Sequence, residues 1–141
     1  MKLIISILLA VTCCAAGLPC GADDWPTYRH DNSRSATTAE KIDAETLELS
    51  WGHRAALAPR PAWAGPAKWD AYNDIPRLNS MRNYDAALHT TVADGKLYFG
   101  SSIDDTVRCL DERTGKVLWQ FTTDGPVRIA PSIAGGKVYF G

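Results

Sequence analysis

The chain has 141 residues, and its 15 lysine and arginine side chains nearly balance its 16 aspartate and glutamate side chains, leaving a net charge of −1. This balance gives no electrostatic basis for binding nucleic acid or an anionic membrane surface. Hydrophobic residues make up 45% of the chain and charged residues 22%, which is ordinary for a globular protein.

Residues 1–22 have the composition of a secretory signal peptide. Lys2 supplies the positive charge, an apolar run extends from Leu3 to Val11, and small residues lead to Ala22. The apolar run is shorter than the ~20 residues of a transmembrane helix. We therefore expect cleavage after Ala22, export to the periplasm, cell surface or medium, and no transmembrane span in the processed chain.

Cysteine usage adds two expectations. A lipid anchor on Cys13, Cys14 or Cys20 is the alternative to simple cleavage, although Pro19 stands where lipoprotein signals have a small residue. After cleavage Cys109 is the remaining cysteine, so the processed chain cannot form an internal disulfide. We expect Cys109 to be a small apolar strand residue rather than a reactive thiol.

Residues 23–54 are expected to form an N-terminal segment. It opens with the irregular polar stretch Trp25-Pro-Thr-Tyr-Arg-His-Asp31, and a short helical turn is predicted in the region that begins at Ala39. Leu47-Glu-Leu-Ser-Trp51 alternates apolar and polar side chains, which predicts a strand.

Residues 55–88 are predicted to be a long insertion loop, because repeated prolines exclude a long helix or a central strand. Loops of this length are commonly functional, and this one is too aromatic for simple disorder. One hypothesis is a cap that contributes to a central pocket, and the other is a belt packed in a groove along the side. The candidate cap residues are Trp63, Trp69, Tyr72, Arg77 and Arg82.

From residue 89 onward the apolar period becomes two, which is typical of antiparallel strands. Turn residues separate the alternating runs and place strands near 89–93, 96–102, 105–111, 116–123, 127–133 and 137–141. The stretch Asp94-Gly-Lys-Leu-Tyr-Phe-Gly100 returns 41 residues later as Gly135-Gly-Lys-Val-Tyr-Phe-Gly141.

A repeat of ~40–45 residues with four short strands is the sequence signature of a β-propeller blade. We therefore expect an all-β fold in which residues 89–141 hold about one complete four-stranded antiparallel blade and the start of the next. Because a blade needs neighbours on both sides, we interpret the chain as the N-terminal fragment of a propeller of about 7–8 blades.

The turn after the third predicted strand of the blade carries a specific motif. Gly115 can take a positive φ in a tight hairpin, Asp111 and Thr114 can accept backbone N–H bonds, and Trp119 follows four residues later. This spacing resembles the tryptophan-docking motif of pyrroloquinoline-quinone-type (PQQ-like) repeats, Ala-x-Asp-x-x-x-Gly-x-x-x-Trp, with Cys109 in place of the alanine. The stretch that begins at Trp25 also resembles the opening segment of secreted propellers of this family.

The N-terminal strand pattern fits the same architecture. Trp51 falls where the docking tryptophan of a blade would be. We expect residues 47–54 to be a ring-closing strand that pairs with a blade beyond residue 141, because closure removes open sheet edges.

The resemblance implies two classes of function. One is a ligand- or protein-binding scaffold without a cofactor, which we expect, with the remaining blades as its first partners. The alternative is a quinoprotein dehydrogenase that oxidises alcohols or sugars with pyrroloquinoline quinone and Ca²⁺; no catalytic or quinone-binding residue is assignable. His30, His53 and His89 are too scattered for a zinc site, and Asp104-Asp105 indicates a polar turn rather than a metal loop.

Overall fold

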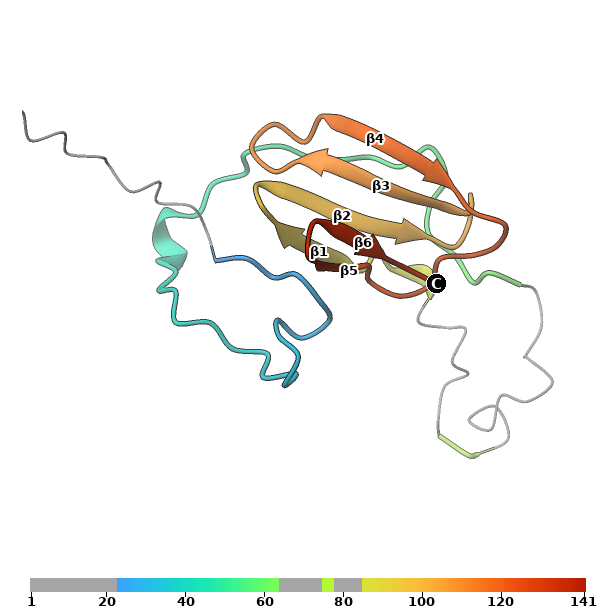
Figure 1. The fold of residues 1–141 in the computed structure, drawn as a ribbon, viewed down its shortest axis with the longest axis horizontal. Helices are drawn as coiled ribbons and strands as arrows, with labels where there is room; N and C mark the ends of the chain where they lie inside the picture. The colour runs from blue at the N-terminus through green and yellow to red at the C-terminus, as the bar shows by residue number, and fades with distance from the viewer. Residues whose placement is uncertain (1–22, 64–74, 78–84) are drawn as a thin grey trace, which may run out of the picture.

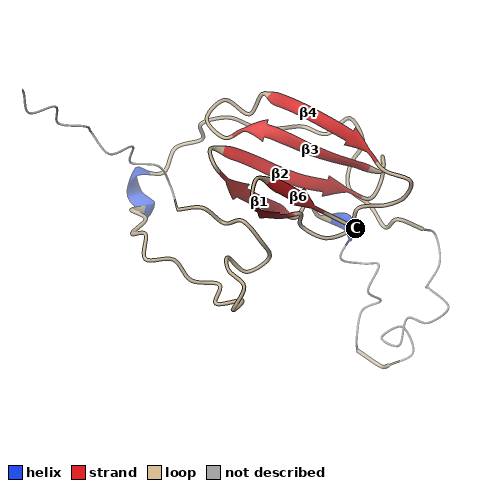
Figure 2. Cartoon of the chain, in the orientation of Figure 1, coloured by secondary structure: helices blue, strands red, loops and turns tan. Residues whose placement is uncertain are grey.

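The computed structural model describes residues 23–63, 75–77 and 85–141. These residues form a short 3₁₀ helix, η1 (Ala44–Thr46), and six strands: β1 (Thr90–Ala93), β2 (Lys96–Ser101), β3 (Thr106–Asp111), β4 (Val117–Thr122), β5 (Ser132–Ala134) and β6 (Lys137–Tyr139). β1 to β4 form one antiparallel sheet in chain order, and β5 and β6 form a second sheet (Figures 1 and 2). The chain is all-β, with one complete four-stranded blade, as predicted.

The sequence repeat is also a repeat of structure. Asp94 and Gly95 turn β1 into β2 with φ values of 53° and 69°, and Gly135 and Gly136 turn β5 into β6 with 56° and 70°. A two-residue turn with two positive φ values is the type I′ turn that suits the twist of a hairpin. The register repeats as well, since Ala93 pairs with Lys96 and Ala134 with Lys137.

The core of the blade lies in its two middle strands. Phe99 of β2 and Val107, Cys109 and Leu110 of β3 are 2% exposed or less. Because successive strand residues point to opposite faces, their burial requires cover on both faces of the sheet. The sheet is therefore the middle layer of a three-layer arrangement.

One face is covered by the N-terminal segment and the other by the chain that follows β4. On the first face, the ring of His53 lies 5.4 Å from that of Phe99. On the second, Val127 lies so close to Gly100 that an added Cβ would be 2.3 Å from its Cγ1. Each cover stands where a propeller blade would have a neighbour.

The fourth strand is the exception to this burial. All six residues of β4 are exposed, including Val117, Leu118, Trp119 and Phe121 at 38–55%. The outermost strand therefore presents large apolar side chains that no described residue covers fully.

Among the other predicted elements, the helical turn is present and one strand differs from its predicted range. The helical turn is confirmed as η1, whose preceding residue Asp43 accepts a hydrogen bond from Glu45 N at 3.1 Å. The predicted strand near 127–133 is wrong in its extent, because backbone pairing with β6 begins only at Ser132. Pro126 and Pro131 cannot donate ladder hydrogen bonds, and the Val127 side chain is instead inserted against Gly100.

The N-terminal segment joins the two hairpins. Trp25 and Val92 of β1 exchange two backbone hydrogen bonds of 2.8 and 3.0 Å, and Ile133 N of β5 donates to Pro26 O at 2.8 Å. Residues 47–54 belong to no strand in the described structure, so their pairing with a further blade stays a prediction.

The leader expected at residues 1–22 lies outside the described ranges. Within those ranges, no helical segment has the length and apolar character that crossing a membrane requires.

Candidate functional site

The predicted motif forms a compact turn between β3 and β4. The Asp111 carboxylate accepts hydrogen bonds from Thr114 N at 2.9 Å and Thr114 Oγ1 at 2.7 Å, and these bonds lower the pKa of Asp111. Gly115 N donates to Asp111 O at 2.8 Å, with φ at +67°. Thus Asp111, Thr114 and Gly115 act together to fix one turn.

A tryptophan from far away in sequence lies on this turn. Trp51 Nε1 donates to Glu112 O at 2.7 Å. A Cβ at Gly115 would lie only 2.4 Å from Trp51 Cε3, so the glycine provides space as well as backbone freedom. The sequence pattern placed Trp51 at the position of a docking tryptophan but did not predict that it docks on this turn. That position was the signal in the sequence that could have identified the contact.

Trp119 lies apart from this contact. It is 38% exposed, and its ring centroid lies 6.0 Å from that of Tyr98. On the face that it shares with Tyr98, β4 also contacts the second hairpin, since Phe121 and Phe140 have centroids 5.8 Å apart. The resemblance to the tryptophan-docking motif implies that Trp119 packs on a neighbouring blade, and this docking stays a prediction.

A buried carboxylate clasps the base of the insertion loop to the blade. Asp85 is 4% exposed, and it accepts hydrogen bonds from Arg128 Nε at 2.7 Å and from Ala62 N at 3.1 Å. Ser102 Oγ lies within hydrogen-bonding distance of the carbonyl oxygens of Arg60 at 3.1 Å and Asp85 at 3.3 Å. Both ends of the loop are thereby held at one place; we call these residues the clasp.

Arg128 extends the clasp to an aromatic ring. Its guanidinium carbon lies 4.5 Å from the ring centroid of Trp63, a cation–π geometry. The sequence contains no motif spacing that links Asp85, Ser102 and Arg128, and sequence reasoning did not find this cluster.

Beside the clasp lies a cavity of about 690 Å³. Its lining includes the charged side chains of Arg60, Asp105 and Asp124 and the indole of Trp63. Charges of both signs and an aromatic ring around one hollow suit a polar ligand or an inserted side chain.

The predicted cap residues are only partly described. Trp63 lines the cavity, and Arg77 is exposed with φ at +72°. Trp69, Tyr72 and Arg82 lie outside the described ranges. The structure therefore places the base of the loop beside a cavity, and the cap remains a hypothesis.

The loop between β2 and β3 is a polar turn, as expected. Asp105 O accepts from Thr123 N at 2.7 Å and from Thr123 Oγ1 at 2.8 Å. Arg108 folds back to form an ion pair with Asp104, and hydrogen bonding by that guanidinium lowers the pKa of Asp104 to about 2.

Cys109 matches the apolar interpretation. The thiol is free and buried, and desolvation raises its pKa above the ordinary value. A raised pKa disfavours the thiolate, which is the reactive form.

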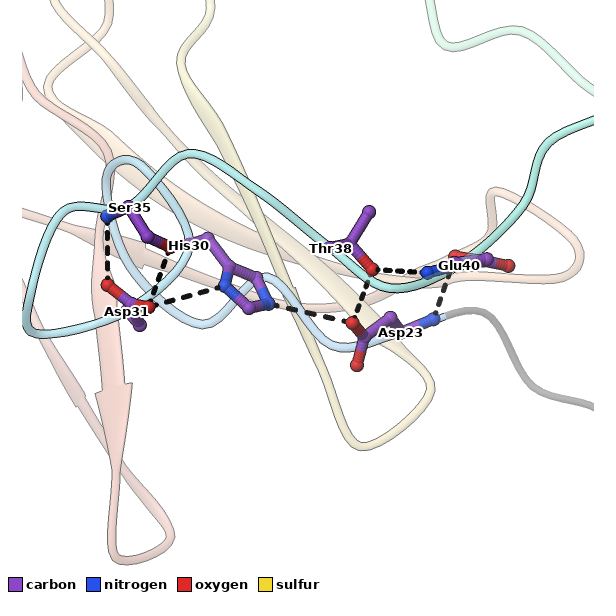
Figure 3. Close-up of polar contacts among 6 residues, drawn as sticks. All are labelled: Asp23, His30, Asp31, Ser35, Thr38 and Glu40. Atoms are coloured by element: carbon purple, nitrogen blue, oxygen red, sulfur yellow. Dashed lines mark hydrogen bonds and ion pairs between the residues drawn. The ribbon is translucent and has the colours of Figure 1, made fainter.

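A second polar cluster lies in the N-terminal segment (Figure 3). His30 Nε2 lies 3.7 Å from an oxygen of Asp23, and its Nδ1 lies 3.7 Å from an oxygen of Asp31. Asp31 also accepts from Ser35 N at 3.0 Å and Ser35 Oγ at 2.7 Å, and these bonds lower its pKa. Asp23 in turn contacts Thr38 and Glu40.

No three His, Cys, Asp or Glu side chains in the described ranges gather as a set that could hold a metal ion. A family model described as outer membrane protein assembly factor BamB, a PQQ-like repeat family, matches residues 41–141. The match includes the Trp51 contact, the clasp and both hairpins. A search of the curated proteins found no match.

Proposed function

Because this chain belongs to the PQQ-like repeat family described by the BamB model, we propose that it is the N-terminal part of an exported β-propeller scaffold that binds a protein or a small ligand. A family described as an assembly factor fits a role in holding other molecules. In this proposal residues 1–22 are the removed leader, 23–54 the N-terminal segment with the ring-closing strand, 55–88 the insertion loop and 89–141 the blade with the start of the next.

The observation that carries the binding role is the cavity beside the clasp. Binding sites work best when their side chains are held in place before the ligand arrives. Asp85 and Arg128 provide such support, because their ion pair is nearly enclosed on the Asp85 side. Arg60, Trp63 and Asp124 then present a cation, an aromatic ring and an anion around the cavity.

The location of the cavity fits a propeller scaffold. It is lined by three connections: the base of the insertion loop, the β2–β3 turn and the residues after β4. Connections at the ends of strands, held by a rigid sheet, are where folds of this kind place their binding residues. We propose that the insertion loop, residues 55–88, acts as a cap at this site, and that the protein works in the periplasm or at the cell surface.

The test uses the complete natural protein, purified from the exported fraction of its source. A photo-crosslinking amino acid at Asp124 is expected to capture the bound protein, and native mass spectrometry is expected to reveal a bound small ligand. Arg60→Ala should reduce capture or occupancy, because it removes a cavity charge and keeps the Arg60 carbonyl oxygen that takes part in the clasp. Arg113→Ala is the matched control, since Arg113 lies in the β3–β4 turn and does not line the cavity.

Two outcomes would contradict the scaffold role. One is equal capture from Asp124 and from a crosslinker at Arg113. The other is saturable, dye-linked oxidation of an alcohol or sugar after addition of pyrroloquinoline quinone and Ca²⁺, which would establish the dehydrogenase alternative. The proposed binding role uses neither a quinone nor a metal ion.

A further inference from the structure

In the N-terminal polar cluster, Asp23 contacts His30, Thr38 and Glu40 (Figure 3). Its backbone N donates to Glu40 Oε2 at 3.1 Å, and its carboxylate accepts from Thr38 Oγ1 at 2.5 Å. The same carboxylate faces His30 Nε2 at 3.7 Å. A main-chain nitrogen aimed at a carboxylate is the arrangement that an α-ammonium group would favour.

The residues just before Asp23 suit a signal peptidase. Cys20 and Ala22 stand three and one residues before the Ala22–Asp23 bond, and both are small, as the A-x-A-like cleavage pattern requires. With the leader removed as in the proposed function, we propose that the ammonium group created at Asp23 is bound by the carboxylate of Glu40. The inference rests on the export that belongs to the proposed function.

The chemical step is an ordinary amide hydrolysis. A signal peptidase adds water to the carbonyl carbon of Ala22, and the bond from that carbon to Asp23 N breaks. Ala22 leaves as a carboxylate with the leader, and Asp23 N takes up both protons of the water and becomes an ammonium group. An α-amino group has an ordinary pKa of about 7.7–8.0, so the new terminus carries a positive charge at neutral pH.

Processing therefore changes the kind of contact at Glu40. Before cleavage a neutral amide donates one hydrogen bond to the carboxylate, and after cleavage the donor is a cation. The other titratable groups of the cluster are the carboxylates of Asp23 and Asp31 and the imidazole of His30. The Asp24 carboxylate instead accepts from Asp94 N at 3.2 Å.

The position of this ion pair gives it a structural use. Two residues beyond Asp23, the segment exchanges backbone hydrogen bonds with β1. An ion pair between the Asp23 ammonium group and Glu40 connects the start of the segment to the residues that lead toward η1. Leader removal would thus strengthen the attachment of the segment that joins the two hairpins.

The first measurement is the N-terminal sequence of the natural protein from the exported fraction. The expected sequence begins at Asp23. An exported protein that begins elsewhere, or carries lipid on Cys20, would overturn the inference and leave export standing. A protein that retains Met1 and stays inside the cell would overturn both the inference and the export on which it rests.

The second measurement is the pKa of the α-amino group, obtained from the pH dependence of competitive acylation read on the N-terminal peptide. Glu40→Gln is expected to lower this pKa by about 0.2–0.7 units, the size of an exposed ion pair. Glu45→Gln is the matched control, because it removes the same charge five residues away and should leave the value unchanged. An equal pKa in wild type and Glu40→Gln would overturn the role of Glu40.

Discussion

Gly115 is constrained both by its backbone and by its neighbour. Its φ of +67° is unfavourable for residues with a side chain. The space above it is filled by the indole of Trp51, 2.4 Å from the position of an added Cβ. The backbone conformation and the close approach of Trp51 therefore both disfavour a side chain at this position.

Gly115→Ala is expected to destabilise the protein more than Gly95→Ala does. Gly95 has nearly the same φ of +69°, but an added Cβ there would meet nothing within 4 Å, so its substitution costs only the backbone strain, about 1–2 kcal/mol. Gly115→Ala adds the displacement of Trp51, about 1–3 kcal/mol more. Urea unfolding of the complete protein measures both, and equal losses would contradict the Trp51 contact.

The ion pair of Asp104 and Arg108 predicts a dependence of stability on pH. The folded pKa of Asp104 is lowered to about 2 from 3.8, so its stabilisation is present above about pH 3.8 and is lost as the pH falls toward 2. Asp104 is 30% exposed, which reduces the expected contribution to about 1–2 kcal/mol.

Asp104→Asn should therefore reduce the free energy of unfolding at pH 6 and flatten its decline between pH 4 and pH 2. Asp105→Asn is the control, because that side chain lies in the same turn outside the ion pair. Urea unfolding across this pH range gives the comparison. A parallel decline in wild type and Asp104→Asn would show that the ion pair contributes nothing.

At the scale of elements, the sequence was most informative about the blade. The predicted first four strands end within one residue of β1 to β4, because the alternating pattern and the turn glycines are local signals. The prediction of the fifth strand was wrong because of a contact between distant residues. Val127 packs against Gly100 and does not take part in strand pairing. The clasp was missed because Asp85 and Arg128 are 43 residues apart and no local pattern joins them.

The exposed tryptophan of β4 gives a testable prediction about packing between blades. Trp119→Ala should cost about 3–5 kcal/mol in the complete protein if a following blade buries the ring. Gln120→Ala is the control on the opposite face of β4 and should cost little. Thermal unfolding measures both, and a loss below about 1 kcal/mol for Trp119→Ala would mean that the indole stays as exposed as the 38% seen here.

At the scale of the whole molecule, the proposed ring accounts for the surfaces that remain open. Leu49 is 90% exposed and residues 47–54 have no strand partner among the described residues. In the proposed ring, closure would pair this segment with a further blade. The same closure would cover the apolar side chains of β4 with a following blade.

Hydrogen exchange tests this ring directly. The amides of residues 47–54 are expected to be protected in the complete natural protein and to exchange rapidly in a chain limited to residues 23–141. The amides of β2 are the internal control, because they are paired on both sides within the blade. Rapid exchange of residues 47–54 in both proteins would exclude the ring-closing strand.

The bridge between the N-terminal segment and the two hairpins has a consequence for the order of folding. Thr27 Oγ1 contacts Ser132 Oγ at 2.8 Å across 105 residues of chain. Because a chain is synthesised from its N-terminus, residues 23–27 are made long before either of their partner strands. Closing so long a loop is slow compared with forming a hairpin. Trp25 can pair with Val92 once β1 has formed, but the attachment of Pro26 and Thr27 waits for β5, so this part of the segment is fixed late in folding.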